Sequence, residues 1–226
     1  RFDSKTDILM KEINKEVIMN QIDNYGADSI VILEGLEAVR KRPGMYIGNI
    51  STRGLNHLIY EIVDNSVDEH LAGFCDSIWV TLEADGSCTV KDNGRGIPVE
   101  LHKKGVSAER IVLSTLHAGG KFDHSSYKTA GGLHGVGSSV VNALSERMTV
   151  KVFRDGKIHF DEYKRGKPAI DLENGLLPIT GQTTETGTEI NFYPDKDIFD
   201  SIIFKAEWLK NRLHETAYLN RELTIY

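Results

Sequence analysis

The sequence has two cysteines among 226 residues, and it contains no long apolar run. Cys75 and Cys88 lack the spacing of metal ligands, so we expect no disulfide framework and a reducing compartment. No apolar segment is long enough to span a membrane, and the N-terminus has no contiguous hydrophobic block of a signal peptide. These absences predict a soluble, cytoplasmic protein.

An excess of basic residues is also missing, because the formal net charge is -6 and the pI is near 5.8. A protein that binds the phosphate backbone of nucleic acids is usually basic, so any DNA contact should lie elsewhere. The length and the 40% of hydrophobic residues allow one large domain or two small ones. Since the chain begins without Met and ends in what resembles the start of a strand, we expect a fragment of a longer protein.

The pattern of apolar residues predicts helices over residues 33–42, 55–71, 107–117, 138–146 and 204–219. Two hairpins are expected, 77–83 with 87–92 and 148–154 with 157–163, followed by a strand over 188–193. Residues 1–28 are expected to form a frayed helix or a mobile arm. Because the strands come in pairs, the sequence favours an α+β fold, a two-layer sandwich of a largely antiparallel mixed sheet with helices on one face.

The predicted helix over residues 55–71 has two different faces. Its packing face consists of Leu55, Leu58, Ile59, Ile62, Val63 and Ser66. Its other face consists of His57, Glu61, Asp64, Asn65 and Asp68. This polar face has three carboxylates and no Lys or Arg, so its charges repel unless a cation joins them. The alternative is an ordinary acidic helix face.

Nine of the 21 glycines lie between Gly94 and Gly137. They fall mainly into two groups, and the second ends where a helix is predicted to begin, an arrangement that favours binding of an anion such as phosphate. A glycine-rich loop without a ligand is the alternative. No G-x-x-x-x-G-K-[ST] motif is present, and Val140 stands where a dinucleotide fingerprint needs Gly or Ala.

Two polar residues are expected to face the core from strands. Alternation places Asp92 on the same face as Cys88 and Val90, and Thr188 on the same face as Ile190 and Phe192. A buried carboxylate requires hydrogen-bond donors, which the amino edge of a nucleotide base could supply. An internal bond from Thr188 or from the backbone is the alternative.

Residues 61–65, 92–98, 131–137 and 186–188 resemble, in order, the four motifs of the GHKL ATPases. Residues 38–48 and 117–122 are similar to those of the bacterial type II topoisomerases, with the gyrase type favoured and the topoisomerase IV type as the alternative. The resemblance runs from about residue 25 to the C-terminus, and residues 1–24 are expected to be an extension or a tag. Chaperones and MutL-type proteins are more remote candidates, and histidine kinases typically lack the carboxylate of Glu61. A clamp that binds ATP with negligible turnover also remains open.

The resemblance implies a role for each matching residue. Glu61 would be the general base for the attacking water, and His57 would orient it. Asn65 would coordinate Mg²⁺ beside the triphosphate of ATP. Asp92 would bind the adenine amino group directly, and Thr188 would do so through water.

Other positions follow from the same resemblance. Gly96 and Pro98 would shape the adenine pocket, and Arg95 and Arg154 would line its mouth. Asn93 stands where many relatives have a second acid, which should not alter the adenine contact. An ATP lid over residues 117–137 would include Gly119, Lys121 and Tyr127, and would offer the phosphates the backbone of Leu133, His134, Gly135, Val136 and Gly137.

The resemblance also implies partners. An arm over residues 25–32, with Tyr25 and Ile30, would embrace a second copy of the same chain in a nucleotide-dependent dimer. The dimer would join the A-type subunit in an A2B2 holoenzyme that contacts DNA, and aminocoumarin-type inhibitors would bind at the ATP site. A following domain would supply a lysine for the γ-phosphate, so the fragment alone should hydrolyse ATP poorly and stay largely monomeric.

Overall fold

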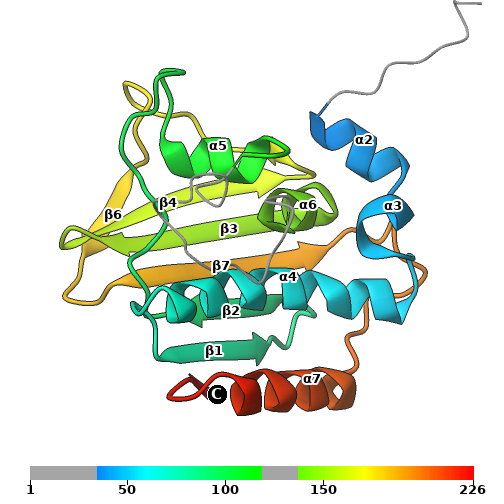
Figure 1. Ribbon diagram of the computed structural model, residues 1–226. Coiled ribbons are helices and arrows are strands. Elements are labelled where there is room, and N and C mark those ends of the chain that lie inside the picture. The colour runs from blue at the N-terminus through cyan, green and yellow to red at the C-terminus, as the bar shows by residue number, and fades with distance from the viewer. Residues whose placement is uncertain (1–34, 119–136) are drawn as a thin grey trace, which may run out of the picture. The chain divides into compact units, whose positions relative to one another are not determined.

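The computed structural model describes residues 35–118 and 137–226, in which helices cover one face of a mixed sheet (Figure 1). The helices are α2 (Gly35–Lys41), α3 (Gly44–Ile47), α4 (Thr52–Leu71), α5 (Ala108–Ser114), α6 (Gly137–Ala143) and α7 (Ala206–Leu219). The strands are β1 (Ser77–Leu82), β2 (Cys88–Asp92), β3 (Ser145–Arg154), β4 (Lys157–Lys164), β5 (Lys167–Pro168), β6 (Ile179–Gln182), β7 (Gly187–Pro194) and β8 (Thr224–Ile225).

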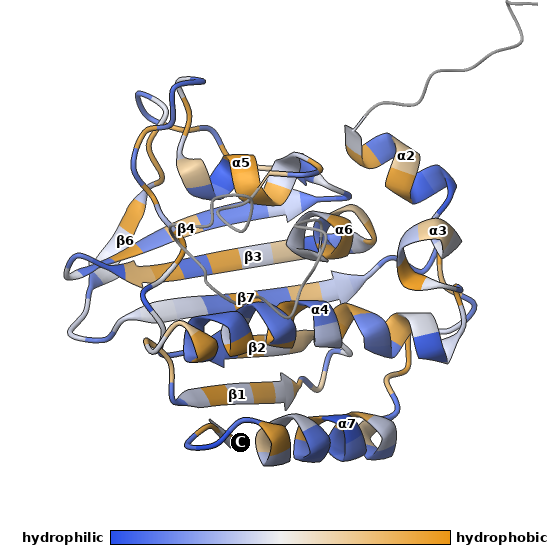
Figure 2. Ribbon diagram, viewed as in Figure 1, coloured by the Kyte–Doolittle hydropathy of each residue, from blue (hydrophilic) through white to orange (hydrophobic). Residues whose placement is uncertain are grey.

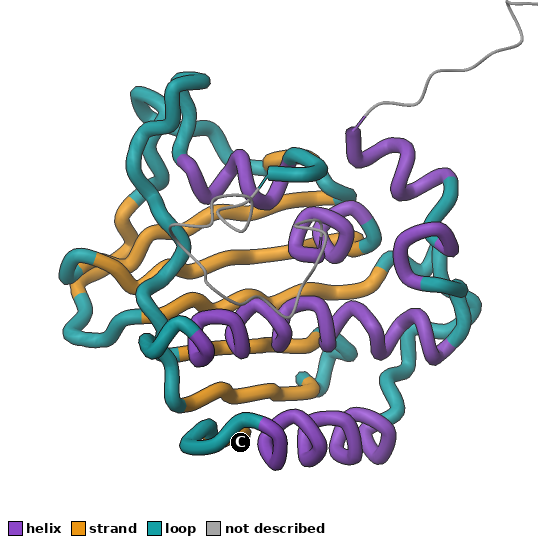
Figure 3. Tube along the Cα trace, viewed as in Figure 1, coloured by secondary structure: helices purple, strands orange, loops and turns teal. Residues whose placement is uncertain are grey.

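The strands of the described residues follow the order β5-β4-β3-β7-β2-β1-β8, and β6 pairs with β4. Every pairing among them is antiparallel except that of β1 with β8, which is parallel. Helices α4, α5 and α6 lie across the same face of this sheet (Figure 3). The predicted α+β class, with a largely antiparallel sheet and helices on one face, is therefore confirmed.

Alternation along the strands builds the core beneath the helices. Cys88 and Val90 of β2, Val150 of β3 and Ile190 of β7 are buried, whereas their neighbours in sequence are more exposed. Figure 2 shows this alternation as orange and blue segments along the strands. The expected packing face of α4, Leu55, Leu58, Ile59, Ile62, Val63 and Ser66, is buried as a whole. One helix thus packs against the inner face of the sheet along most of its length.

Both predicted hairpins are present, and their turns have the backbone that their sequences require. Asp155 and Gly156, between β3 and β4, both have positive φ angles of 53° and 75°. Such a two-residue turn matches the right-handed twist of the paired strands. Gly86, in the turn between β1 and β2, has a φ of 89°.

Several helices differ from their predicted ranges, and α4 begins at Thr52 rather than at 55. Helix α6 ends at Ala143 rather than at 146, because Ser145 already pairs with Pro194 as the first residue of β3. Helix α5 is shorter than predicted and ends at Ser114. Pro43 was expected only to stop α2, but its φ of -59° is the one that a helix needs, and α3 begins directly after it.

A buried carboxylate ties α2 to the sheet. Asp195, which is fully buried after β7, accepts a hydrogen bond from Arg40 of α2 at 2.7 Å and ion-pairs with Arg165 at 3.1 Å. Arg40 also donates to the carbonyl oxygen of Ala143 at the end of α6. Because a buried charge is costly without partners, both arginines are needed to keep this carboxylate in place.

The face of the sheet opposite the helices carries a row of aligned side chains, one aromatic on β1 and three charged on β2, β7 and β3. Register places Trp79 opposite Lys91, Lys91 opposite Glu189, and Glu189 opposite Lys151. Lys151 and Glu189 form an ion pair at 2.9 Å, and Lys91 pairs with Glu185 at 2.7 Å. We call Lys91, Glu189 and Lys151, together with Glu185, the outer charged row.

Other features agree with the composition. Cys75 and Cys88 are both buried and free, and burial raises the pKa of the Cys75 thiol to about 11, so it packs as a neutral group. In the described part of the chain, no helix has both the length and the apolar character that crossing a membrane requires.

Helix α5 is anchored to β4 by a buried cluster of ionisable groups. Arg110 makes two hydrogen bonds to Asp161, at 2.6 and 2.9 Å, and the Tyr163 hydroxyl donates to Asp161 at 2.7 Å. Glu109 is fully buried beside them, with its carboxyl oxygens 3.2 and 3.3 Å from the same hydroxyl. Burial, and then the neighbouring Asp161 carboxylate, raise the pKa of Glu109 well above its usual value. Folding therefore favours the protonated form of Glu109.

This cluster makes stability depend on pH. Because the folded pKa of Glu109 is raised, its stabilising contribution is complete below the unfolded pKa of roughly 4.3 and is lost as pH rises through the folded value. The variant Glu109→Gln mimics the protonated acid and cannot titrate. We expect its free energy of unfolding, measured in urea between pH 5 and 9, to decline less with pH than that of the wild type. Glu207→Gln on the exposed side of α7 is the control, and parallel curves for all three proteins would contradict the assignment.

Candidate functional site

Helix α4 carries a polar face opposite its core face, but this face is smaller than the sequence predicts. His57, Glu61, Asp64 and Asn65 are partly exposed, whereas Asp68 is buried with an exposure of 1%. Asp68 is therefore not open to solvent, contrary to expectation, although its position in the helix lies between those of His57 and Glu61. Two carboxylates, of Glu61 and Asp64, remain on the accessible side.

Glu61 and His57 form a pair one turn apart on α4. The Nε2 atom of His57 lies 2.9 Å from Oε1 of Glu61. The hydrogen bond to Glu61 raises the pKa of His57, although partial burial opposes this rise. Their side chains are 39% and 29% exposed, so a small molecule such as water can reach them. The arrangement holds a carboxylate in a fixed direction beside a group that can become cationic.

The second oxygen of Glu61 lies against the start of α6. A Cβ atom added at Gly137 would overlap with Oε2 of Glu61. Glycine is needed here for space, since it lets the backbone of the helix start approach the carboxylate closely. Among the predicted phosphate-binding positions, Gly137 is the one that the structure describes. Gly119, Lys121, Tyr127, Leu133, His134, Gly135 and Val136, and the arm residues Tyr25 and Ile30, lie outside the described residues.

Asn65 contacts the same helix start. Its Nδ2 atom donates to the hydroxyl of Ser138 at 2.8 Å, so its amide oxygen points in a different direction. An amide oxygen is a hard donor of the kind that Mg²⁺ accepts, and this ion usually takes few protein ligands together with phosphate oxygens and waters. The described residues contain no group of three or more His, Cys, Asp or Glu that could hold a metal by itself. The donor set thus fits Mg²⁺ that arrives with a phosphate ligand.

Asp92, at the end of β2, faces the core as predicted. Its Oδ2 atom accepts from Ser66 Oγ of α4 at 2.8 Å, and its Oδ1 atom accepts from the backbone N–H groups of Gly94 at 2.9 Å and Thr188 at 3.3 Å. Burial raises the pKa of Asp92, and these three donors oppose the rise. The carboxylate therefore has the internal partners that its burial requires, and Ser66 is one that the sequence pattern assigns only to packing.

The loop after β2 packs against the start of β7. Gly96 has a φ of 77°, and a Cβ there would lie 3.0 Å from the carbonyl oxygen of Gly187. Gly187 has a φ of 136°, and its own Cβ would overlap with the carbonyl oxygen of Asp92. The Thr188 hydroxyl accepts from the N–H of Ile97 at 3.2 Å. Asp92, Gly96 and Thr188, predicted to act together, are thus neighbours, and Pro98 is exposed just beyond them.

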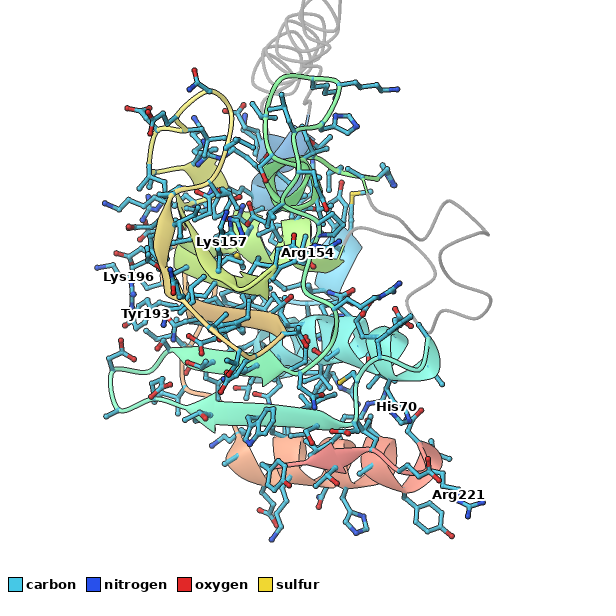
Figure 4. All side chains as sticks on the ribbon, turned by 90° about the vertical axis from the view of Figure 1, so that its left-hand side faces the viewer. His70, Arg154, Lys157, Tyr193, Lys196 and Arg221 are labelled. Carbon is cyan, nitrogen blue, oxygen red and sulfur yellow. The ribbon has the colours of Figure 1, made fainter. Side chains whose placement is uncertain are left out.

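The two predicted arginines are both engaged in contacts that stabilise this loop. Arg95 makes two side-chain hydrogen bonds to Glu69, at 2.9 and 3.0 Å, and lies over the ring of Phe74. Arg154, labelled in Figure 4, donates to the carbonyl oxygen of Gly96 at 2.9 Å and forms an ion pair with Glu100 at 3.2 Å. Glu69 was not among the residues predicted for the site from the sequence. Its spacing of four residues from Asn65, which puts the two on one side of α4, could have indicated it.

The end of α4 is fixed to two other segments. The ring nitrogens of His70 lie 2.6 Å from the carbonyl oxygen of Cys75 and 3.0 Å from that of Arg221. Figure 4 shows His70 and Arg221 on neighbouring segments. At the other end of α4, the Asn56 side chain exchanges two hydrogen bonds with the backbone of Lys205, just before α7. The helix that carries Glu61 is therefore held at both ends.

Known proteins share the sequence that builds this site. The family model described as "Histidine kinase-, DNA gyrase B-, and HSP90-like ATPase" matches residues 50–198. The B subunit of DNA gyrase from Halalkalibacterium halodurans is 56% identical over 203 residues, which cover 89% of this chain and 31% of that protein. The B subunit of DNA gyrase from Archaeoglobus fulgidus is 55% identical over 201 residues, covering 89% of this chain and 32% of that protein.

The B subunit of DNA topoisomerase 4 from Staphylococcus epidermidis is 53% identical over 209 residues, or 92% of this chain and 31% of that protein. The chain thus spans about a third of the length of these relatives. The segment that matches the family model includes α4, β2, Gly137 and β7, which together carry Glu61, Asp92 and Thr188. The predicted resemblance is confirmed, and the chain belongs to the histidine kinase-, DNA gyrase B- and HSP90-like ATPase family.

Proposed function

We propose that this chain is the ATP-binding and ATP-hydrolysing domain of a DNA gyrase B subunit, which drives negative supercoiling of DNA through nucleotide-dependent dimerisation. The observation that carries the proposal is the Glu61 carboxylate, held by His57 at 2.9 Å and placed against the start of α6. The identity of 56% to a B subunit of gyrase supports the choice of protein. Topoisomerase IV is the second candidate, supported by an identity of 53%.

Nucleotide binding would use the acceptor and the donors at the end of β2 and the start of β7. The Asp92 carboxylate would accept a hydrogen bond from the adenine amino group, with Thr188 contributing through water. Gly96 and Pro98 would shape the wall of the pocket, and Arg95 and Arg154 would line its mouth. A charge-assisted hydrogen bond in a buried pocket is about twice as strong as a neutral one, so Asp92 would give adenine specificity.

Hydrolysis would use α4. Glu61 would take the proton of the attacking water. His57 would keep the carboxylate oriented through the contact of its Nε2 atom with Oε1. Asn65 would hold Mg²⁺ through its amide oxygen. The ion would neutralise charge that develops on the phosphates. It would also relieve the repulsion between Glu61, Asp64 and the triphosphate, for which residues 55–71 of α4 offer no Lys or Arg.

The remaining assignments concern segments beyond the described residues. We propose that residues 117–137 form the ATP lid, in which Gly119, Lys121 and Tyr127 cover the nucleotide and residues 133–137 donate to its phosphates. Residues 25–32, with Tyr25 and Ile30, would embrace a second copy of the same chain, and residues 1–24 would be an extension. A domain in the part of the relatives that this chain does not cover would supply the lysine that contacts the γ-phosphate.

The partners follow from the same proposal. The dimer would join the A-type subunit of gyrase in an A2B2 holoenzyme, and DNA would be bound through that holoenzyme, since this chain has a net charge of -6. Aminocoumarin-type inhibitors would compete for the ATP site. A cytoplasmic location is supported by the two free buried cysteines.

Replacement of Glu61, the proposed general base, should impair ATP hydrolysis without impairing ATP binding. Glu61→Ala is expected to bind Mg-ATP as the wild type does, because the residue does not contact adenine, and to lose roughly 10²–10⁴ in turnover, as when a general base is removed. Steady-state ATPase assays and calorimetry measure the two quantities. Glu207→Ala on α7 is a control of the same residue type. Unchanged turnover in Glu61→Ala would remove Glu61 from the mechanism.

Replacement of the buried carboxylate should remove nucleotide binding. Asp92→Ala loses the only proposed direct contact to the adenine amino group, and we expect calorimetry to show no adenine-specific binding. Asp92→Asn keeps the shape of the side chain and tests the charge alone. Asp85→Ala, in the turn that leads into β2, is the control and should bind normally. ATP affinity within twofold of wild type in both Asp92 variants would give this residue a purely structural role.

The choice between the two topoisomerases can be tested with the full-length protein. Reconstituted with the A-type subunit of gyrase, it should introduce negative supercoils into relaxed plasmid in the presence of ATP. Glu61→Ala in the same holoenzyme is the matched control, because it should abolish ATP-dependent supercoiling. Decatenation without supercoiling would favour topoisomerase IV. Nucleotide-dependent dimerisation with negligible ATP turnover would instead indicate a clamp that only binds ATP.

A further inference from the structure

Ser66 lies at the point where α4 crosses the end of β2. It follows Asn65 directly but faces the core, with an exposure of 2%. Its hydroxyl donates to Oδ2 of Asp92 at 2.8 Å, and the two residues are 26 positions apart in the chain. The sequence pattern explains its burial, since Ser66 shares a face with Ile62 and Val63, but not why a polar side chain occupies that face.

The carboxylate of Asp92 has a limited number of acceptor sites. An ionised carboxylate has about four, two on each oxygen. Oδ1 receives the N–H groups of Gly94 and Thr188, at 2.9 and 3.3 Å, and is fully used. Oδ2 receives Ser66 and keeps one acceptor site. Any ligand that binds this carboxylate must therefore donate to the oxygen that Ser66 already contacts.

We propose that Ser66 is a positioning residue that sets the specificity of the pocket for adenine. This inference rests on the proposed binding of ATP by Asp92. With its hydrogen committed to a charged acceptor, the Ser66 hydroxyl cannot turn to donate to a ligand. Because Ser66 donates to Oδ2 and favours the ionised carboxylate, that oxygen stays an acceptor, which an amino group satisfies and the carbonyl oxygen that guanine carries at the same place does not. A protonated Asp92 could instead donate to that carbonyl oxygen, so loss of Ser66 should narrow the preference.

Ser66 also helps to keep the carboxylate charged. Burial raises the pKa of Asp92, and the negative charge of Glu69 on α4 adds to the rise. The bonds from Gly94, Ser66 and Thr188 lower it, and the Cys75 thiol nearby is neutral. Without Ser66 the pKa of Asp92 should rise further. Nucleotide binding needs the ionised form of Asp92. As the solution is made more acidic, a variant without Ser66 should therefore lose nucleotide affinity at a higher pH than the wild type does.

The test compares binding of a non-hydrolysable ATP analogue and its guanine counterpart by calorimetry, with the 226-residue chain between pH 5 and 8. Ser66→Ala is expected to weaken ATP-analogue binding about tenfold, to narrow the preference for adenine over guanine, and to move the acid limb of the affinity profile to higher pH. Ser66→Thr keeps the hydroxyl and should restore all three properties. Ser66→Cys preserves volume with a much weaker donor and serves the same purpose if Ser66→Ala does not fold.

A matched control is Ser145→Ala, which also removes a fully buried serine hydroxyl. The Ser145 hydroxyl donates to the carbonyl oxygen of Val141 at 2.7 Å. This variant should have a lower melting temperature, but its preference for adenine and the acid limb of its affinity profile should be those of the wild type. If Ser66→Ala binds both nucleotides as the wild type does, at every pH, the role of Ser66 is overturned while ATP binding stands. If the wild type itself shows no adenine preference, or Asp92→Ala binds ATP normally, the proposed function and this inference fail together.

Discussion

Burial of the Asp92 carboxylate is the constraint on which the site depends. A charge in this position needs donors, and the protein takes them from three separate segments, α4, the loop after β2 and the start of β7. These contacts join residues 26 and 96 positions apart. One carboxyl group therefore fixes how the central helix, the glycine loop and the strand meet, and the positive φ angles of Gly96 and Gly187 are what allow the backbones to come close enough.

Helix α4 both anchors the fold and carries the site, because one of its faces is buried in the core and the other is polar and partly exposed. The core face is packed against the sheet along most of its length, and both helix ends are tied to other segments through Asn56 and His70. This rigidity lets the polar face hold Glu61 in one direction, between His57 and the start of α6. A carboxylate on a mobile loop would need binding energy to reach the same orientation.

Sequence patterns predicted those parts of the structure that local rules determine. The hairpins, β7, α4 and the inward direction of Asp92 follow from periodicity and turn residues, and their ends are shifted by a few positions at most. Three things could not be predicted in this way. Asp68 is buried although it lies on the polar side of α4, and the Arg40–Asp195 contact spans 155 positions. Strands β5 and β6 have only two and four residues, too few for any period to appear. The role of Ser66 likewise depends on a partner that only the folded chain supplies.

The outer charged row has a consequence for how the protein behaves among its own copies. A sheet covered on one face leaves half of each strand's side chains toward water, and such a surface could stack on another like it. Here lysine and glutamate alternate across the strands, and Lys91 lies over the rings of Trp79 and Phe153, at 5.9 and 4.9 Å from their centres. A second sheet would have to strip water from these charges and break their pairing before gaining any apolar contact. Among the described residues, the outer charged row therefore opposes the stacking of one sheet on another.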